Sequence, residues 1–316
     1  MKFALSGASG MIGSALRRSL ENDQHEVIPL VRSNSGNGIP WNPEKQTIDL
    51  ASLEGVDGII HLAGENIAGA RWTDAFKEKV YLSRSQGTST LSRAIKRMDR
   101  PPSLFVSASA TGYFGDRGDE RLTEDSPPGI GFLPTVCRAW EDAARPAALE
   151  TRLIVTRFGM VLAREGGALA KMLLPFRLGL GGVVGSGQQY MSWISLTDAV
   201  SAIRHLIDHD HAEGTFHLVS PSPVTNREFT KTLGNVLHRP TLFPLPAGIA
   251  RLLMGEMADG LLLSSARVLP SRLLEAGFRF KHPDLRSALV SILDPNRPSR
   301  TGSVADDSRG EKGREH

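Results

Sequence analysis

Three glycines near the start of the chain, Gly7, Gly10 and Gly13, have the spacing of a turn that can hold a phosphate. They follow an apolar stretch typical of a strand and precede periodic apolar residues typical of a helix. In such a turn the first glycine allows the tight bend, the second leaves room for a pyrophosphate, and the third lets the helix pack closely. The helix N-terminus would face the phosphates with its positive end. The same spacing also fits a purely structural turn. The candidate dinucleotide site comprises Gly7, Ser9, Gly10, Met11, Ile12 and Gly13.

Arg32 follows the next predicted strand, in the segment HEVIPLVR. In a dinucleotide-binding fold the second strand ends beside the adenosine ribose. A carboxylate there would accept a hydrogen bond from a ribose hydroxyl, whereas a guanidinium pairs with a phosphate through two hydrogen bonds. Arg32 therefore favours NADP over NAD, and the alternative is a solvated arginine at a strand end.

The segment IIHLAG ends a third predicted strand with small residues. Leu62, Ala63 and Gly64 would let the nicotinamide-side ribose approach the backbone closely. Together with the glycine turn and Arg32, they indicate a dinucleotide-binding protein.

The elements that position these residues alternate along the chain between strands and helices. This order predicts an α/β fold, a Rossmann-type doubly wound parallel sheet covered on both faces. The predicted strands are Phe3–Ser6, Glu26–Val31, Gly58–Leu62, Leu104–Ser107, Leu153–Phe158 and Phe216–Val219, and the predicted helices include Ser14–Asn22, Trp72–Met98, Val136–Ala148 and Thr197–Asp208.

The later part of the chain predicts a smaller, mostly helical substrate lobe. We expect a dinucleotide-binding domain over residues 1–165, to which a strand at 216–220 returns, and a substrate-cleft lobe with a C-terminal helical region over 166–293. Residues 294–316 are charged and poor in apolar residues, which predicts a disordered tail.

Composition narrows the class of protein. The net charge of +3 comes from scattered basic residues rather than a dense run, which argues against nucleic-acid binding. Cys137 is the only cysteine, so the chain has no intrachain disulfide and no thiol cluster for zinc. Neither a signal core nor an apolar span of membrane length is present. We therefore expect a cytoplasmic protein with a small-molecule substrate, no membrane partner and no metal. Its long helices are a candidate surface for a homodimer.

Longer motifs resemble the extended short-chain dehydrogenase/reductases, the NAD-dependent epimerase/dehydratase group. The chain is most similar to an atypical epimerase-like branch that includes the human short-chain dehydrogenase/reductase family 39U member. The resemblance implies a Rossmann domain that binds a nicotinamide dinucleotide, with NADP favoured, and a substrate cleft below the later lobe. It covers nearly all of residues 1–293, through GASGMIG, HLAGENI, RW at 71–72, SASATGYFG, WEDAA, RFGMVL, GGAL, MLLPFRLGLGG, GSGQQYMSWIS and LPSRLLEAGFRF.

The superfamily's chemistry uses a serine or threonine that holds the substrate oxygen, a tyrosine that transfers a proton, and a lysine four residues later. The resemblance matches the serine to Ser109, with Ser107 as a less favoured alternative. Counting back from WEDAA places Leu133 at the tyrosine position and Cys137 at the lysine position. Neither side chain can replace its counterpart.

Tyr113, four residues after Ser109, is the remaining candidate for the acid/base. It follows a strand's carboxyl end, where catalytic groups collect in this architecture, and its alternative role is a packing or substrate-wall residue. Arg138 is a candidate for positive charge near the ribose, or else a surface ion pair. The sequence thus predicts an NADP-dependent oxidoreductase or epimerase with an altered proton relay. The alternative is a non-catalytic dinucleotide-binding sensor or interaction protein.

The segment GSGQQYMSWIS leaves two interpretations open. Gln188, Gln189, Tyr190 and Trp193 offer donors and flat apolar area that suit a polar organic substrate. The same residues also suit a glycine loop that closes over a core tryptophan. Ser195 occupies a position where similar proteins often have histidine, so no imidazole is available there.

Overall fold

The computed structural model describes residues 1–32 and 38–294, and an eight-stranded sheet forms its centre. Neighbouring strands are parallel throughout, except that the last pair at one edge is antiparallel. In spatial order the strands are β12 (Gly214–Leu218), β8 (Arg152–Phe158), β6 (Leu104–Ala110), β5 (Gly58–His61), β1 (Lys2–Ser6), β2 (Glu26–Val31), β3 (Ile39–Asn42) and β4 (Thr47–Ile48).

Strand β1 lies inside the sheet, and the chain winds away from it in both directions. β2 pairs with one side of β1 and β5 with the other, so the strand order reverses between β1 and β5. Phe3, Ala4, Leu5 and Ser6 are all buried because helices cover both faces. In open α/β sheets, ligands bind beyond the carboxyl ends of the strands at such a reversal.

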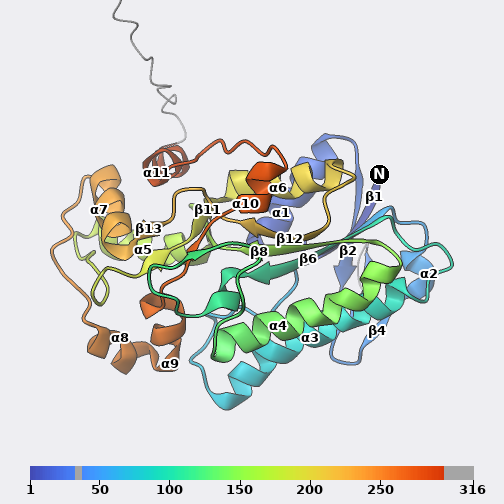
Figure 1. Ribbon diagram of the computed structural model, residues 1–316, viewed down its shortest axis with the longest axis horizontal. Coiled ribbons are helices and arrows are strands. Elements are labelled where there is room, and N and C mark those ends of the chain that lie inside the picture. The colour runs from blue at the N-terminus through green and yellow to red at the C-terminus, as the bar shows by residue number, and fades with distance from the viewer. Residues whose placement is uncertain (33–37, 295–316) are drawn as a thin grey trace, which may run out of the picture.

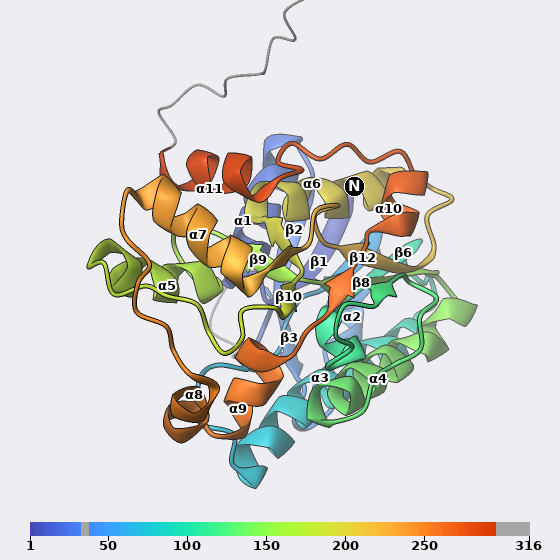
Figure 2. The ribbon, with the colours of Figure 1, turned by 60° about the vertical axis from the view of Figure 1, so that its left-hand side comes forward.

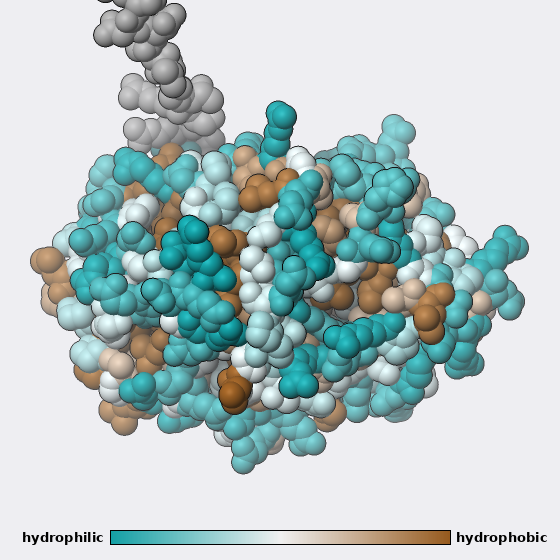
Figure 3. Space-filling view, in the orientation of Figure 1, coloured by the Kyte–Doolittle hydropathy of each residue, from teal (hydrophilic) through white to brown (hydrophobic). Residues whose placement is uncertain are grey.

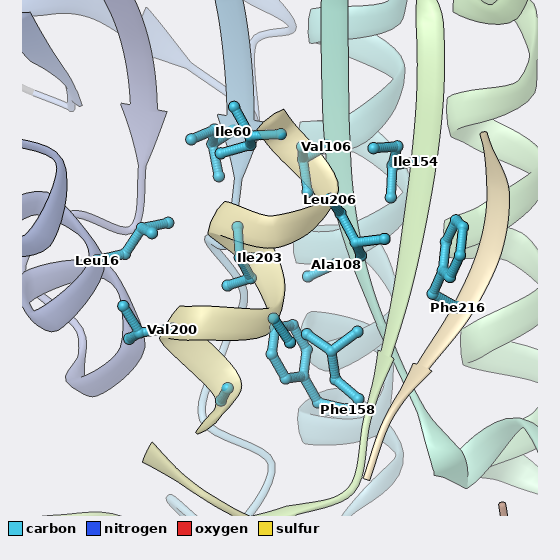
Figure 4. Close-up of a cluster of buried hydrophobic side chains, with 14 of the residues drawn as sticks. Leu16, Ile60, Val106, Ala108, Ile154, Phe158, Val200, Ile203, Leu206 and Phe216 are labelled. Atoms are coloured by element: carbon cyan, nitrogen blue, oxygen red, sulfur yellow. The ribbon is translucent and has the colours of Figure 1, made fainter. Parts of the chain in front are cut away.

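Two pairs of helices cover the sheet (Figure 1). Helices α1 (Met11–Asn22) and α6 (Leu196–Asp208) lie on one face, and α3 (Asp74–Ile95) and α4 (Phe132–Ala144) run side by side on the other. In Figure 4, apolar side chains of α6 interlock with those of α1 and the strands, among them Val200, Ile203 and Leu206. Burial of these surfaces is the main favourable contribution to folding.

The C-terminal part has an apolar core of its own. Helices α5 (Gly167–Arg177), α7 (Asn226–Leu237) and α11 (Leu285–Leu293) contribute to a cluster that includes Leu173, Phe229 and Leu289. Figure 2 shows α7 and α11 side by side, with α8 (Ala247–Met254) and α9 (Glu256–Ala258) farther from the sheet. The short elements are α2 (Leu50–Leu53), α10 (Ser271–Glu275), β7 (Arg121–Leu122), β9 (Met160–Leu162), β10 (Tyr190–Met191), β11 (Trp193–Ser195), β13 (Val224–Thr225), β14 (Arg267–Val268), the 3-10 helices η1 (Thr111–Phe114) and η2 (Arg145–Leu149), and the π-helix η3 (Asp259–Leu263).

The predicted Rossmann-type α/β fold is confirmed, and all six predicted strands form in the sheet. Strands β3 and β4 were not predicted, because they are short and one contains Pro40. The two predicted regions interleave: α6 and β12 follow residue 165 in sequence, yet both belong to the layers of the sheet. Residues 295–316 of the predicted disordered tail lie outside the described residues.

The surface mixes residue types. On the face shown in Figure 3, hydrophobic residues are scattered among hydrophilic ones. Within residues 1–32 and 38–294, no helix combines the length and the apolar character needed to cross a membrane.

Candidate functional site

The glycine turn between β1 and α1 has space for glycine but not for larger residues at two positions. Gly7 has a φ of +71°, and a Cβ there would lie 2.9 Å from the backbone of Leu62 and Ala63. A Cβ at Gly13 would lie 2.1 Å from the carbonyl oxygen of Gly7. The turn therefore brings β1, β5 and α1 into backbone contact.

Gly10 is less crowded than Gly7 and Gly13. Among the described residues, a Cβ there would meet the Gly7 oxygen alone within 4 Å, at a close 3.2 Å, and the φ of Gly10 is −73°. Gly10 is the N-cap of α1, and no side chain caps this helix. The first amides of a helix have no intrahelical acceptor, so those of Met11, Ile12 and Gly13 are available to an anion.

The loop after β5 is held by a buried serine that the sequence analysis did not single out. Ser6 Oγ accepts hydrogen bonds from the amides of Leu62 (3.1 Å) and Ala63 (3.2 Å). It pairs with His61 Nδ1 at 2.6 Å, to which it can donate its proton. Burial lowers the pKa of His61 to about 3, aided by the charge of Arg84. The imidazole is therefore neutral at physiological pH and fixes the segment against β1.

The remaining predicted cofactor residues lie around this turn or on α4. Arg32 is exposed at the end of β2, and Gly64 is exposed after β5. Arg138 is exposed on α4, whereas its neighbour Cys137 is buried. Consecutive residues of a helix project about 100° apart, so the side chain of α4 that faces inward here is that of Cys137.

A row of polar residues crosses the carboxyl ends of three strands. Arg157 on β8 is in register with Ser109 on β6 and with His217 on β12. We call Ser109, Arg157 and His217, with Glu141 and Glu124, the polar row. All five are buried, with at most 7% of their surface exposed.

Glu141 of α4 ties the row together. Arg157 Nε and Nη2 donate to the two oxygens of Glu141 at 2.8 Å each. The Ser109 hydroxyl donates to Glu141 Oε1 at 2.7 Å. Burial opposes the charge of Arg157, but the pairing with Glu141 outweighs it and raises the pKa of the guanidinium. The two hydrogen bonds of the pair compensate part of the cost of burying its charges.

Tyr113 lies directly on this pair. Its ring centroid is 3.5 Å from Arg157 Cζ, so the ring lies against the guanidinium that is hydrogen-bonded to Glu141. Tyr113 is half-buried in η1. The structure thus brings both predicted catalytic residues, Ser109 and Tyr113, to one buried cation.

His217 and Glu124 form the far end of the row. His217 Nδ1 donates to the carbonyl of Leu269 (2.9 Å), and Glu124 accepts from the His217 amide (3.1 Å). Burial lowers the pKa of His217 to about 3 and raises that of Glu124. Within the described ranges, His217 Nε2, Glu124 Oε2 and Arg157 Nη1 have no hydrogen-bond partner. In those ranges, no three His, Cys, Asp or Glu residues gather as metal ligands.

Comparison with known proteins places this geometry in a family. Residues 4–219 match the model of the NAD dependent epimerase/dehydratase family. The chain belongs to this family. Residues 245–292 match a second model, a domain of unknown function, DUF1731.

The relatives cover nearly the whole chain. Epimerase family protein ML0860 of Mycobacterium leprae is 41% identical over 289 residues, which are 90% of this chain and 94% of the relative. Human epimerase family protein SDR39U1 is 36% identical over 296 residues, 93% of this chain and 100% of the relative. The crystal structure of the human protein (isoform 2), determined with NADPH, has a TM-score of 0.86 at 36% identity and covers 92% of this chain and 99% of that one. The predicted resemblance is therefore confirmed.

Within this epimerase/dehydratase fold, Leu133 and Cys137 do lie at the site. A Cβ at Gly112 of η1 would lie 3.3 Å from Leu133 Cβ and 3.7 Å from Cys137 Sγ. Burial raises the pKa of Cys137 to about 12, with a further contribution from Glu141. The thiol is neutral, so α4 places neither an acid/base nor a cation at these two positions.

A cation comes instead from α3. Arg84 is half-buried; its Nη1 donates to the carbonyl of Val80 and its Nη2 to that of Glu65, both at 3.1 Å. Its Cζ lies 5.0 Å from the centroid of the Trp140 ring. Burial lowers the pKa of Arg84, and Cys137 and Glu65 offset part of the shift. Arg84 was not predicted as a site residue, because nothing in the spacing of α3 marks an arginine that points toward β5.

In the segment GSGQQYMSWIS, two side chains have structural roles. Trp193 is fully buried, and its Nε1 donates to the carbonyl of Ser222 (3.0 Å). Gln189 Nε2 donates to the carbonyls of Val184 and Leu262. Tyr190 is half-buried, with Arg267 Cζ 4.7 Å from its ring. Of the two interpretations, the structure favours the loop over a core tryptophan.

Proposed function

We propose that the protein binds NADPH at the carboxyl edge of β1 and β5 and acts on a small polar metabolite as an oxidoreductase or epimerase. The observation that carries the proposal is the uncapped N-terminus of α1, which opens at the point where the strand order reverses. Three free amides and the helix dipole suit a pyrophosphate. Gly10 leaves the approach open. When bound, the dinucleotide supplies or accepts a hydride.

The choice of NADPH over NADH rests on Arg32 and on a relative. Arg32 is exposed where β2 ends, the position that lies beside the adenosine ribose in this fold. The human relative of 36% identity was crystallised with NADPH. A guanidinium at this position pairs with a 2′-phosphate and offers nothing comparable to a free hydroxyl.

Tyr113 is the proposed acid/base, and Ser109 helps to hold the substrate oxygen. Tyr113 is half-buried, and its ring is fixed by Arg157 against one face. Ser109 donates its proton to Glu141, so it offers a substrate only its oxygen lone pairs until the hydroxyl turns. The Arg157 guanidinium, which lies against the ring, helps to position Tyr113.

A second candidate function is non-catalytic dinucleotide binding, as in a redox sensor. It is favoured by one observation: Leu133 and the neutral Cys137 lie where the family's proton-transferring pair is expected. The two candidates share the cofactor site and differ only in turnover.

Titration and turnover separate the possibilities. We expect NADPH to bind more tightly than NADH when followed by nucleotide fluorescence or calorimetry. Loss of NADPH absorbance is then measured across a panel of carbonyl compounds and nucleotide sugars. No detectable binding of either nucleotide would reject both candidates. Tight binding without turnover on any member would favour the sensor.

On a substrate that turns over, Tyr113→Phe tests the relay. Removing the phenolic hydroxyl while keeping the ring should lower kcat by about 10² or more and change the alkaline limb of the pH profile. Ser109→Ala should lower kcat by about 10² if its hydroxyl turns from Glu141 to donate a hydrogen bond to the developing charge. An unchanged kcat for Tyr113→Phe would make Tyr113 a wall residue. The matched control is Tyr81→Phe, on the exposed surface of α3.

A further inference from the structure

The cofactor site lacks a cation where α4 would provide one. Cys137 faces inward, 4% exposed, and carries no charge. Arg138, the next residue, is exposed on another side of the helix. A site that fixes the nicotinamide end of a dinucleotide through α4 therefore has no charged donor from this helix.

Arg84 reaches the same region from the neighbouring helix. α3 and α4 run side by side (Figure 2). The Arg84 guanidinium lies against the Trp140 ring of α4. A Cβ at Gly64 would lie 3.4 Å from Arg84 Cζ. The guanidinium thus lies directly beside the loop that follows β5.

The guanidinium is held firmly and retains unused donors. The carbonyls of Val80 and Glu65 each accept one N–H, and the Trp140 ring supports one face. A guanidinium has five N–H groups. Within the described part of the chain, the recorded hydrogen bonds engage only these two nitrogens once each. The remaining donors are available to a ligand that lies over Gly64.

We propose that Arg84 is a cofactor-binding residue that donates hydrogen bonds to the nicotinamide-side ribose and supplies the positive charge at that end of the site. The proposal rests on the proposed NADPH binding. Gly64 is exposed and has no side chain to cover the guanidinium, so a ligand over Gly64 could reach Arg84. Arg32 and Arg84 would then mark opposite ends of the dinucleotide.

Two ligands distinguish a ribose contact from a structural role. NADPH contains the nicotinamide-side ribose, whereas adenosine 2′,5′-bisphosphate contains only the adenosine end. Arg84→Gln should weaken NADPH and NADH by a similar factor, about tenfold to hundredfold for a lost charge-assisted contact. Its affinity for adenosine 2′,5′-bisphosphate should stay unchanged, which also shows that the variant is folded.

Two further variants complete the test. Arg84→Lys keeps the charge and should restore part of the NADPH affinity lost in Arg84→Gln. Arg93→Gln, on the exposed surface of α3, is the matched control and should bind both ligands normally. The role of Arg84 would be overturned if Arg84→Gln weakened NADPH and adenosine 2′,5′-bisphosphate equally, or weakened neither of them. If the unmodified protein binds neither ligand, the proposed function itself fails.

Discussion

The glycine turn and the polar row lie at the same edge of the sheet, but they are built from opposite kinds of groups. At the turn, the chain removes side chains and leaves the backbone amides of α1 without partners. In the polar row, Glu141, Arg157 and Ser109 bind one another and almost no surface is exposed. The glycine turn can therefore accept a ligand, whereas the polar row makes most of its hydrogen bonds within the protein.

This difference separates binding from stability. A substitution at Gly10 should affect ligands more than folding, because a Cβ there is less crowded than one at Gly7 or Gly13. Substitutions in the polar row should affect folding first, because each partner there compensates another buried group.

The largest effect is expected from Glu141→Ala. It leaves the Arg157 guanidinium buried without its carboxylate and Ser109 without its acceptor. Breaking a buried pair typically costs about 3–5 kcal/mol, which is a large share of a typical domain's stability. Urea unfolding followed by circular dichroism measures the change in the free energy of unfolding.

Asp142→Ala is the matched control, one residue further along α4. Asp142 pairs with Arg145 at the surface, where the side chains are 55% and 73% exposed. An exposed pair contributes about 0–1 kcal/mol. Similar losses for Glu141→Ala and Asp142→Ala would contradict the idea that the polar row is a stability element.

Gly10→Val should have the opposite profile. Its φ of −73° is accessible to valine, and among the described residues a Cβ meets one atom within 4 Å, the Gly7 oxygen at 3.2 Å, so the fold should remain after a small local shift. The branched side chain would stand in front of the α1 amides and lower the affinity for NADPH and NADH by about a hundredfold or more, which is at least about 2.7 kcal/mol. Thermal unfolding and nucleotide titration are measured on the same sample. Normal nucleotide affinity would show that the glycines form only a turn.

Arg32→Ala should change affinity for one nucleotide and not for the other. Losing a charge-assisted contact to the 2′-phosphate should cost about 1.5–3 kcal/mol, which is roughly tenfold to hundredfold in the Kd of NADPH. NADH lacks this phosphate, so its Kd should stay the same. Calorimetric titration with both nucleotides measures the ratio. Equal losses for the two would remove the phosphate assignment.

The glycine turn could be predicted from the sequence better than the polar row, for a physical reason. Local spacing defines a strand, a glycine turn and a helix start, so Gly7, Gly10 and Gly13 could be found within one short stretch. The fold class followed from the alternation of strands and helices. The polar row joins residues from β6, α4, β8 and β12, and no local pattern shows that Glu141 and Arg157 pair.

Ser109 and Arg84 illustrate the limit on single residues. The position of Ser109 at the end of β6 could be predicted, but the donation of its proton to Glu141 could not. The missing lysine was visible in the sequence as Cys137, whereas a cation on another helix was not. A cation on one helix can take the place of a lysine on another only if the two helices pack together, as α3 and α4 do.

The smallest effect concerns His61, which lies near the glycine turn but is buried like the residues of the polar row. His61 is fully buried behind the β5 loop, and its pKa of about 3 lies well below the value of 6.5 expected in the unfolded chain. Between these values the unfolded state binds the proton and the folded state does not. The stability that His61 contributes is therefore complete above about pH 6.5 and declines as the pH falls toward 3.

The pH dependence can be assigned with His61→Asn, which does not titrate. Lowering the pH from 6.5 to 5.5 should cost the unmodified protein about 1 kcal/mol more than this variant. His217 also has a pKa of about 3 and remains in both proteins, so it cancels in the comparison. Urea unfolding at several pH values in this window measures the two slopes. Parallel slopes would mean that His61 accepts a proton in the folded protein, and that the segment after β5 is less firmly closed than its hydrogen bonds to Ser6 indicate.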